Sequence, residues 1–185
     1  AGGYPYIALG YLTSFGAITD ELFPITSSMS DYELMNGSVY PYVGVDSVIY
    51  IDGSDRDTIK TAVYNYGAAI GNFHYDTTYS SAGNSAYYCD LKDIVTSRLL
   101  GHAVSIIGWG DNYSRYNFSA EHRPENNGAW FCKNSWGTGY GAQGYIWISY
   151  EDMHLFDSRF GPSYSIMSYT EKNPNTAVKQ NEKYG

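Results

Sequence analysis

The chain has 185 residues, of which 43% are hydrophobic, so it is long enough and apolar enough for one domain with a sizeable core. Its formal net charge of −8 comes without a basic patch, which argues against a nucleic-acid partner. No apolar run reaches the length of a membrane span.

The first predicted element is a helix from Tyr4 to Phe15. Pro5 suits a first helical turn, and Gly16 is a natural stop. The apolar residues that share one face of this helix are Tyr6, Leu9, Leu12 and Phe15. This face needs cover from another surface, so the sequence predicts an exposed apolar patch in the isolated chain. Residues 25–44 are polar and irregular, and we expect a loop there.

Alternating residues predict a strand over 45–51, and a second helix follows it. We expect Ser54 to open this helix and Gly67 to end it. Its expected apolar face consists of Ile59, Ala62, Val63 and Tyr66. The acidic run 52–57 fails the spacing of an EF-hand, so it indicates a helix cap and a solvated turn instead of a calcium site.

Further strands are expected in the second half of the chain, at 68–75, 86–89, 101–110, 130–134, 145–150 and 163–169. The last of these is predicted to close the sheet. The stretch 151–154 indicates a short helical turn, because no second ligand pair for a metal lies nearby. Several short strands after one helix favour an α+β fold, with an antiparallel sheet or barrel and helices at its side.

The two cysteines, Cys89 and Cys132, are too few for a disulfide framework. Cys132 lies in a predicted strand and is most simply a buried apolar thiol. Cys89 is either free or paired with a cysteine outside this chain, and the sequence does not exclude a bridge to Cys132, although strand geometry gives that bridge no support. Three glycosylation sequons have meaning only on a glycosylating secretory route; they begin at Asn36, Asn112 and Asn117.

Two stretches, 101–110 and 130–137, carry the chemistry. His102 stands at the start of an apolar run, and Asn134 follows it by 32 positions, enough for a strand, a loop and a return strand. The Asn134 carboxamide is then able to accept the proton of one ring nitrogen, which leaves the other nitrogen to exchange a proton with a thiol. Trp136 is placed to cover that hydrogen bond. The alternative is a core histidine and an unrelated turn asparagine.

These motifs resemble the His and Asn motifs of the papain-like cysteine peptidases, most closely those of prokaryotic members. The resemblance begins at the paired glycines before Tyr4 and runs to about Tyr169. It implies a papain-like fold in three parts. They are a remnant of the helical lobe at 1–44, the β domain with the histidine and asparagine at 45–169, and a polar tail or linker at 170–185.

The resemblance also implies the roles of single residues. His102 and Asn134 would be catalytic and Trp136 supporting, while the residues that contact substrate would be Gly2, Gly3, Tyr4, Pro5, Gly71, Leu100 and Ala103. The segment that carries the nucleophilic cysteine in the family has no match in these residues, so a missing N-terminal segment or a separate chain is the expected partner. The expected substrate is a peptide or protein, no cofactor or metal is expected, and the expected location is extracellular or at the cell surface.

Two other functions stay open at this point. An inactive relative would bind peptide or glycan through the surviving cleft and the 21 tyrosines of the chain, since tyrosine suits binding surfaces. A structural or adhesive module is less well supported, because such a module has no need of the paired histidine and asparagine. A Cys-Trp signature upstream of Ala1 would favour the peptidase.

Overall fold

The computed structural model describes residues 4–19, 43–92 and 101–171. The chain forms two compact units. One unit consists of Ala1–Tyr6 with Val48–Ile166, and the other of Ile7–Ser47 with Met167–Gly185. Within the described ranges, no helix is long and apolar enough to cross a membrane.

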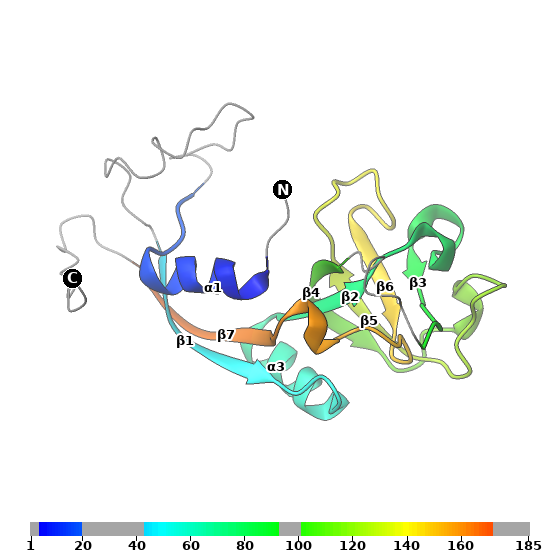
Figure 1. Ribbon diagram of the computed structural model, residues 1–185, viewed down its shortest axis with the longest axis horizontal. Helices are drawn as coiled ribbons and strands as arrows, with labels where there is room; N and C mark the ends of the chain where they lie inside the picture. Colours follow the sequence, from blue (N-terminus) through cyan, green and yellow to red (C-terminus); the bar gives the residue numbers. More distant parts are fainter. Residues whose placement is uncertain (1–3, 20–42, 93–100, 172–185) are drawn as a thin grey trace. The chain divides into compact units, whose positions relative to one another are not determined.

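A five-stranded sheet forms the centre of the first unit (Figure 1). In spatial order its strands are β2 (Ala69–His74), β4 (Gly101–Gly110), β5 (Ala129–Lys133), β6 (Tyr145–Ser149) and β3 (Ala86–Tyr87). The pairs β2–β4, β4–β5 and β5–β6 are antiparallel, as predicted, but the edge strand β3 runs parallel to β6. The α+β class is confirmed, with a mixed sheet in place of a purely antiparallel one.

The last predicted strand forms as β7 (Ser163–Glu171), but the prediction that it closes the sheet is wrong. It pairs with β1 (Val43–Ile51) in a separate two-stranded sheet. The outer edge of β2 is already occupied, because Phe156 N–H donates to the Asn72 carbonyl at 2.8 Å. The turn before β7 therefore takes the position that a sixth strand would need.

The second predicted helix is present as α3 (Arg56–Tyr66), and it packs against β2 and β4. Its cap is Asp55 and not Ser54, because the Asp55 carboxylate accepts from Asp57 N at 2.9 Å and from Thr58 N at 3.4 Å. A bond from the Thr58 hydroxyl at 2.7 Å, and then these two backbone bonds, lower the pKa of Asp55. The predicted apolar face is buried at Ile59, Ala62 and Val63, and Gly67 ends the helix with φ of 86°.

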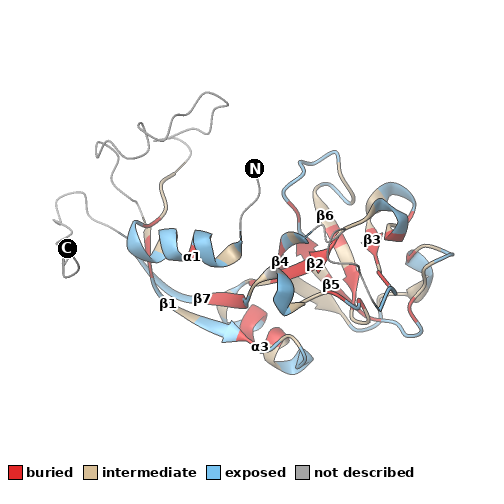
Figure 2. Cartoon of the chain, viewed as in Figure 1, coloured by how far each residue is buried: buried red, intermediate tan, exposed pale blue. Residues whose placement is uncertain are grey.

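The first predicted helix is α1 (Pro5–Ser14), and much of it is exposed (Figure 2). Of the predicted apolar face, Leu9 is buried, whereas Tyr6 is 49% and Phe15 54% exposed. Ile7 is also exposed, at 58%. The expected apolar surface is therefore present at several of these side chains. Most of the loop predicted at 25–44 lies outside the described residues, and its last two residues begin β1.

The core of the first unit consists largely of buried residues from every strand of the five-stranded sheet and from α3, which Figure 2 colours red. Ile146 on β6 and Ile106 on β4 are fully buried. They lie in one cluster with Phe73, Trp130 and Cys132. This cluster supports the strand ends that carry the predicted site residues.

We expect Ile146→Ala to lower the free energy of unfolding by roughly 2–5 kcal/mol, because truncation of a fully buried isoleucine removes its contacts and leaves a cavity. Urea unfolding followed by circular dichroism measures the loss. Ile49→Ala is the matched control, since Ile49 is 36% exposed and the same truncation leaves little cavity there. Equal losses in the two variants would contradict the assigned core.

Candidate active site

His102 is the second residue of β4 and lies opposite Phe73 on β2. The two rings meet edge to face, with centroids 5.8 Å apart. Residues opposite one another on an antiparallel pair point to the same face, so β2 fixes the side of the sheet on which the imidazole lies. His102 is partly buried.

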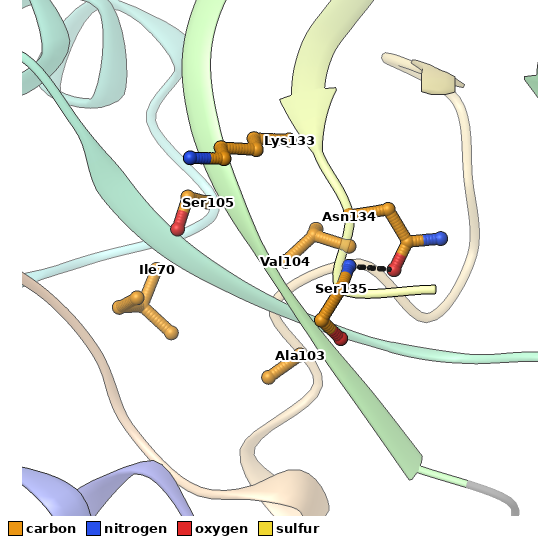
Figure 3. Close-up of a pocket in the computed structure, with 7 residues that line it drawn as sticks. All are labelled: Ile70, Ala103, Val104, Ser105, Lys133, Asn134 and Ser135. Carbon is orange, nitrogen blue, oxygen red and sulfur yellow. Dashed lines mark hydrogen bonds between the residues drawn. The ribbon is translucent and has the colours of Figure 1, made fainter. Parts of the chain in front are cut away.

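Asn134 follows the end of β5, and its backbone N–H donates to the Gly144 carbonyl at 2.9 Å. Its side-chain Oδ1 accepts from the Ser135 N–H at 2.8 Å (Figure 3). A backbone N–H is always a donor, so this bond orients the carboxamide. The same oxygen lies 2.8 Å from His102 Nε2, which confirms the contact expected from the sequence. Since Oδ1 is an acceptor, Nε2 carries the proton.

This arrangement leaves His102 Nδ1 as the proton acceptor of the neutral ring. None of the described residues makes a hydrogen bond to it. Burial lowers the pKa of His102, and the bond to Asn134 partly opposes that effect. The neutral form is therefore favoured, and the free nitrogen is suited to take a proton from an incoming thiol.

Trp136 lies against the His102 ring, with centroids 4.2 Å apart and planes 22° from parallel. The sequence placed a tryptophan here as the cover of the His–Asn bond, and the stacking agrees with that position. The indole is itself 39% exposed. The indole therefore covers one face of the imidazole and is itself partly exposed to solvent.

A hollow of about 270 Å³ lies beside Asn134, and His102 is not among the residues that line it. Its lining is formed by Ile70, Ala103, Val104, Ser105, Lys133, Asn134 and Ser135 (Figure 3). Ala103 is one of the predicted substrate residues. Successive side chains of a strand point to opposite faces, so Ala103 and Ser105 lie on the face of β4 away from His102. The hollow combines an apolar side with the Lys133 ammonium and two hydroxyl groups.

Gly71 is not among the residues that line this hollow. It pairs with Val104, and a Cβ at this position would meet Ile106 Cδ1 at 3.0 Å and Leu155 Cδ1 at 3.2 Å. Its side-chain position therefore faces the core, and the neighbour Ile70 lines the hollow instead. A substrate role for Gly71 stays a prediction.

The structure describes only some of the other predicted substrate residues. Pro5 accepts a hydrogen bond at its carbonyl from the Tyr164 hydroxyl, at 3.1 Å. Tyr4 is 51% exposed, and both residues border Gly161. Three predicted residues lie outside the described part of the chain, namely Gly2, Gly3 and Leu100.

Both cysteines are fully buried and neither is in a disulfide, so the prediction of Cys132 as a buried thiol is confirmed. Burial raises the pKa of Cys89 to about 12 and that of Cys132 further still. The Cys89 amide is also fixed, because it donates to Asp152 Oδ2 at 2.9 Å. Neither thiol is placed or ionised as a nucleophile requires.

Two tyrosines beside the site were missed in the sequence. Tyr75 and Tyr140 both contact the Trp136 ring edge to face, at 4.5 Å and 4.6 Å between centroids. Tyr75 follows Phe73 by two positions and so shares its face, which is the signal that the sequence offered. Tyr140 lies in a glycine-rich turn and gave no such signal.

The stretch 151–154 forms a turn, without a helix, around the buried Asp152. Its carboxylate accepts from the backbone of Cys89, His154 and Leu155, and burial raises its pKa to about 6. In the described ranges, no group of three or more His, Cys, Asp or Glu side chains is placed to hold a metal ion.

The comparisons with known proteins show the family of this chain. Residues 1–161 match the papain family of cysteine proteases, so the chain belongs to this family. A clostridial cysteine protease, Cwp84 after propeptide cleavage, is 31% identical with a TM-score of 0.82, over 93% of this chain and 42% of that one. A structure of the cysteine protease and lectin-like domains of Cwp84, a surface layer associated protein of Clostridium difficile, is 30% identical with a TM-score of 0.82, over 94% of this chain and 38% of that one.

Curated relatives are similar over shorter stretches. A cathepsin L-like protein of Caenorhabditis elegans is 32% identical over 58% of this chain and 28% of its own length. Cysteine proteinase 1 of Zea mays is 29% identical over 80% of this chain and 36% of its own length. The chain thus spans about a third of the length of these relatives.

Proposed function

We propose that this chain is the His- and Asn-bearing part of a cysteine-type peptidase that hydrolyses peptide bonds by a Cys-His-Asn mechanism. The observation that carries the proposal is the 2.8 Å contact between His102 Nε2 and Asn134 Oδ1. It orients the imidazole and leaves Nδ1 open toward a thiol. Membership of the papain family supports the same chemistry.

In the proposed reaction His102 Nδ1 takes the proton of a cysteine thiol. A free thiol titrates near ~8.5, and an imidazolium partner lowers that value by several units. The thiolate attacks the peptide carbonyl carbon, and the imidazolium then protonates the leaving amine. Water, deprotonated by His102, attacks the thioester, which releases the acid and returns the thiol. Asn134 holds the ring in the required tautomer throughout.

The nucleophile belongs in this proposal to an N-terminal segment or a separate chain. Full burial and a raised pKa argue against Cys89 and Cys132 as the nucleophile. The same partner would supply the donors of the oxyanion hole, which must lie beside the attacking sulfur. The 185 residues alone are therefore expected to be inactive.

The proposed substrate is an extended peptide. Gly2 and Gly3 would offer main-chain groups to it, since a missing side chain lets two backbones approach. Ala103 lines the hollow beside Asn134. Tyr4, Pro5, Gly71 and Leu100 would complete the predicted pocket for the residue two before the cut. An extracellular or cell-surface location is supported by similarity to a surface layer associated protein.

The alternative is an inactive relative that binds peptide or glycan in the surviving cleft. Two buried thiols and an intact His–Asn pair within the described residues are compatible with it. Under this alternative, restoring an upstream segment would give binding without hydrolysis.

The deciding experiment is hydrolysis of a fluorogenic peptide by the 185-residue chain and by the chain joined to its natural upstream sequence. We expect turnover only in the joined protein, and loss of that turnover after alkylation with iodoacetamide. Turnover by the 185 residues alone would place the nucleophile at Cys89 or Cys132. No turnover by a folded joined protein that contains an upstream cysteine would favour the binding alternative.

A further inference from the structure

The geometry points to Tyr75 and Tyr140 as a pair of positioning residues that hold Trp136 over the His102 ring through a hydrogen bond between their two hydroxyl groups. The inference rests on the proposed function for its catalytic meaning. Whether the hydrogen-bonded tyrosine pair holds the indole in place is tested separately from catalysis.

The three aromatic side chains form a closed triangle. Tyr75 and Tyr140 meet Trp136 edge to face, at interplanar angles of 65° and 85°. The two phenol oxygens lie 2.8 Å apart, within hydrogen-bond distance. The indole that stacks on His102 is thus flanked on two sides by rings that are bonded to each other.

Trp136 has need of such support. It lies beyond the end of β5, in an irregular turn, and is 39% exposed. Gly137 and Gly141 in the same turn have φ of 81° and 58°. Glycine at these positions permits the turn but adds little stiffness, because it carries no side chain to pack. The stacking on His102 therefore depends on contacts from outside the turn.

Tyr75 supplies the connection to the rigid sheet. It directly follows β2, which pairs with β4 along its whole length, and its ring stacks on Tyr87 at 5.7 Å. Tyr140 belongs to the turn itself. Burial, and then the bond to Tyr75, raise the pKa of Tyr140, so the Tyr140 hydroxyl keeps its proton at physiological pH. One of the two hydroxyl groups donates to the other. The bond therefore ties the turn to the sheet.

The consequence for the active site follows from solvent access. Trp136 excludes water from one face of the imidazole, and burial is the main cause of the lowered pKa of His102. An indole that moves away exposes the ring and the bond between Nε2 and Asn134 Oδ1 to competing water. Tyr75 also meets the imidazole edge to face, with ring centroids 6.4 Å apart, and Tyr75→Phe keeps that contact because it keeps the ring. The hydrogen bond between the two hydroxyl groups acts on His102 through Trp136.

The test uses a double-mutant cycle with Tyr75→Phe, Tyr140→Phe and the double variant in the 185-residue chain. Each substitution keeps the ring and removes the hydroxyl. Labelling with 5-fluorotryptophan gives one fluorine resonance for each of the four tryptophans, and Trp136→Phe assigns the one of interest. The NMR titration of the His102 imidazole is recorded in parallel.

If the hydroxyl bond is the support, the two single variants and the double variant change the Trp136 resonance by the same amount, because each removes the same bond. The His102 pKa rises in all three variants, because the ring becomes more exposed to solvent. Tyr64→Phe, at a residue that is 83% exposed, is the matched control and changes neither signal.

Additive changes in the two single variants, or an unchanged Trp136 resonance in both, would overturn the inference, whatever the catalytic competence of the chain. In the protein joined to its nucleophile segment, the single variants are expected to lower kcat with little change in KM. If the proposed peptidase function fails, that last readout is lost, but the fluorine and imidazole signals still decide the role of the pair.

Discussion

Substitution of His102 by alanine in the protein joined to its nucleophile segment is expected to lower kcat/KM for a peptide substrate by about 10²–10⁴-fold, the usual contribution of a positioned acid–base group. The residue has two tasks in the proposed reaction, since it takes the thiol proton and then protonates the leaving amine. Alanine does neither. The measurement is the initial rate of fluorogenic peptide hydrolysis under substrate-limited conditions.

Two further variants make this result specific. Asn134→Ala keeps the imidazole but removes the oxygen that holds Nε2–H at 2.8 Å, so its loss is expected to be smaller than that of His102→Ala. His122→Ala is the matched control, because His122 bonds to Asp90 in a different part of the described structure. Activity that survives in His102→Ala would show that another group moves the proton.

The sheet could be predicted strand by strand because its sequence signals are local. The run that begins at His102 and the one that ends before Asn134 both became strands within a residue or two of their predicted bounds. Pairing is a different kind of property. The place of β7 depends on the bond from Phe156 to the outer edge of β2, which joins residues 84 positions apart and has no signature in either segment.

The same distinction applies to the site. The contact between His102 and Asn134 was predictable, since both residues lie in motifs with a chemical reason for their spacing. The Tyr75–Tyr140 bond was not predictable, because a tyrosine in a strand and another in a glycine-rich turn have many uses in a chain with 21 tyrosines. The helix cap was predicted at Ser54, one residue before the actual cap, Asp55. From the sequence alone the two are equally good capping residues. In the structure the Ser54 hydroxyl donates to Asp52 instead of capping the helix.

The pKa of His102 is expected to be lowered in the 185-residue chain and raised in the protein joined to its nucleophile segment. In the 185-residue chain, burial lowers its pKa below the ordinary value of about 6.5. A lowered folded-state pKa means that the unfolded chain binds the proton more readily. This group therefore adds stability at pH values above about 6.5, and the added stability is lost as the pH falls through the folded-state pKa.

A thiolate placed against Nδ1 reverses this effect, because an opposite charge favours the imidazolium and raises the pKa of the ring, by about 1–3 units for a close pair. The thiol and the imidazole then titrate as one coupled pair. We expect NMR of the His102 ring to show a low pKa in the chain alone and a raised apparent pKa in the joined protein. Replacing the upstream cysteine by alanine restores the low value, since it removes the charge and keeps the packing. A His102 pKa that is the same with and without that cysteine would mean that the sulfur does not reach Nδ1, and the proposed Cys-His-Asn arrangement would then be wrong.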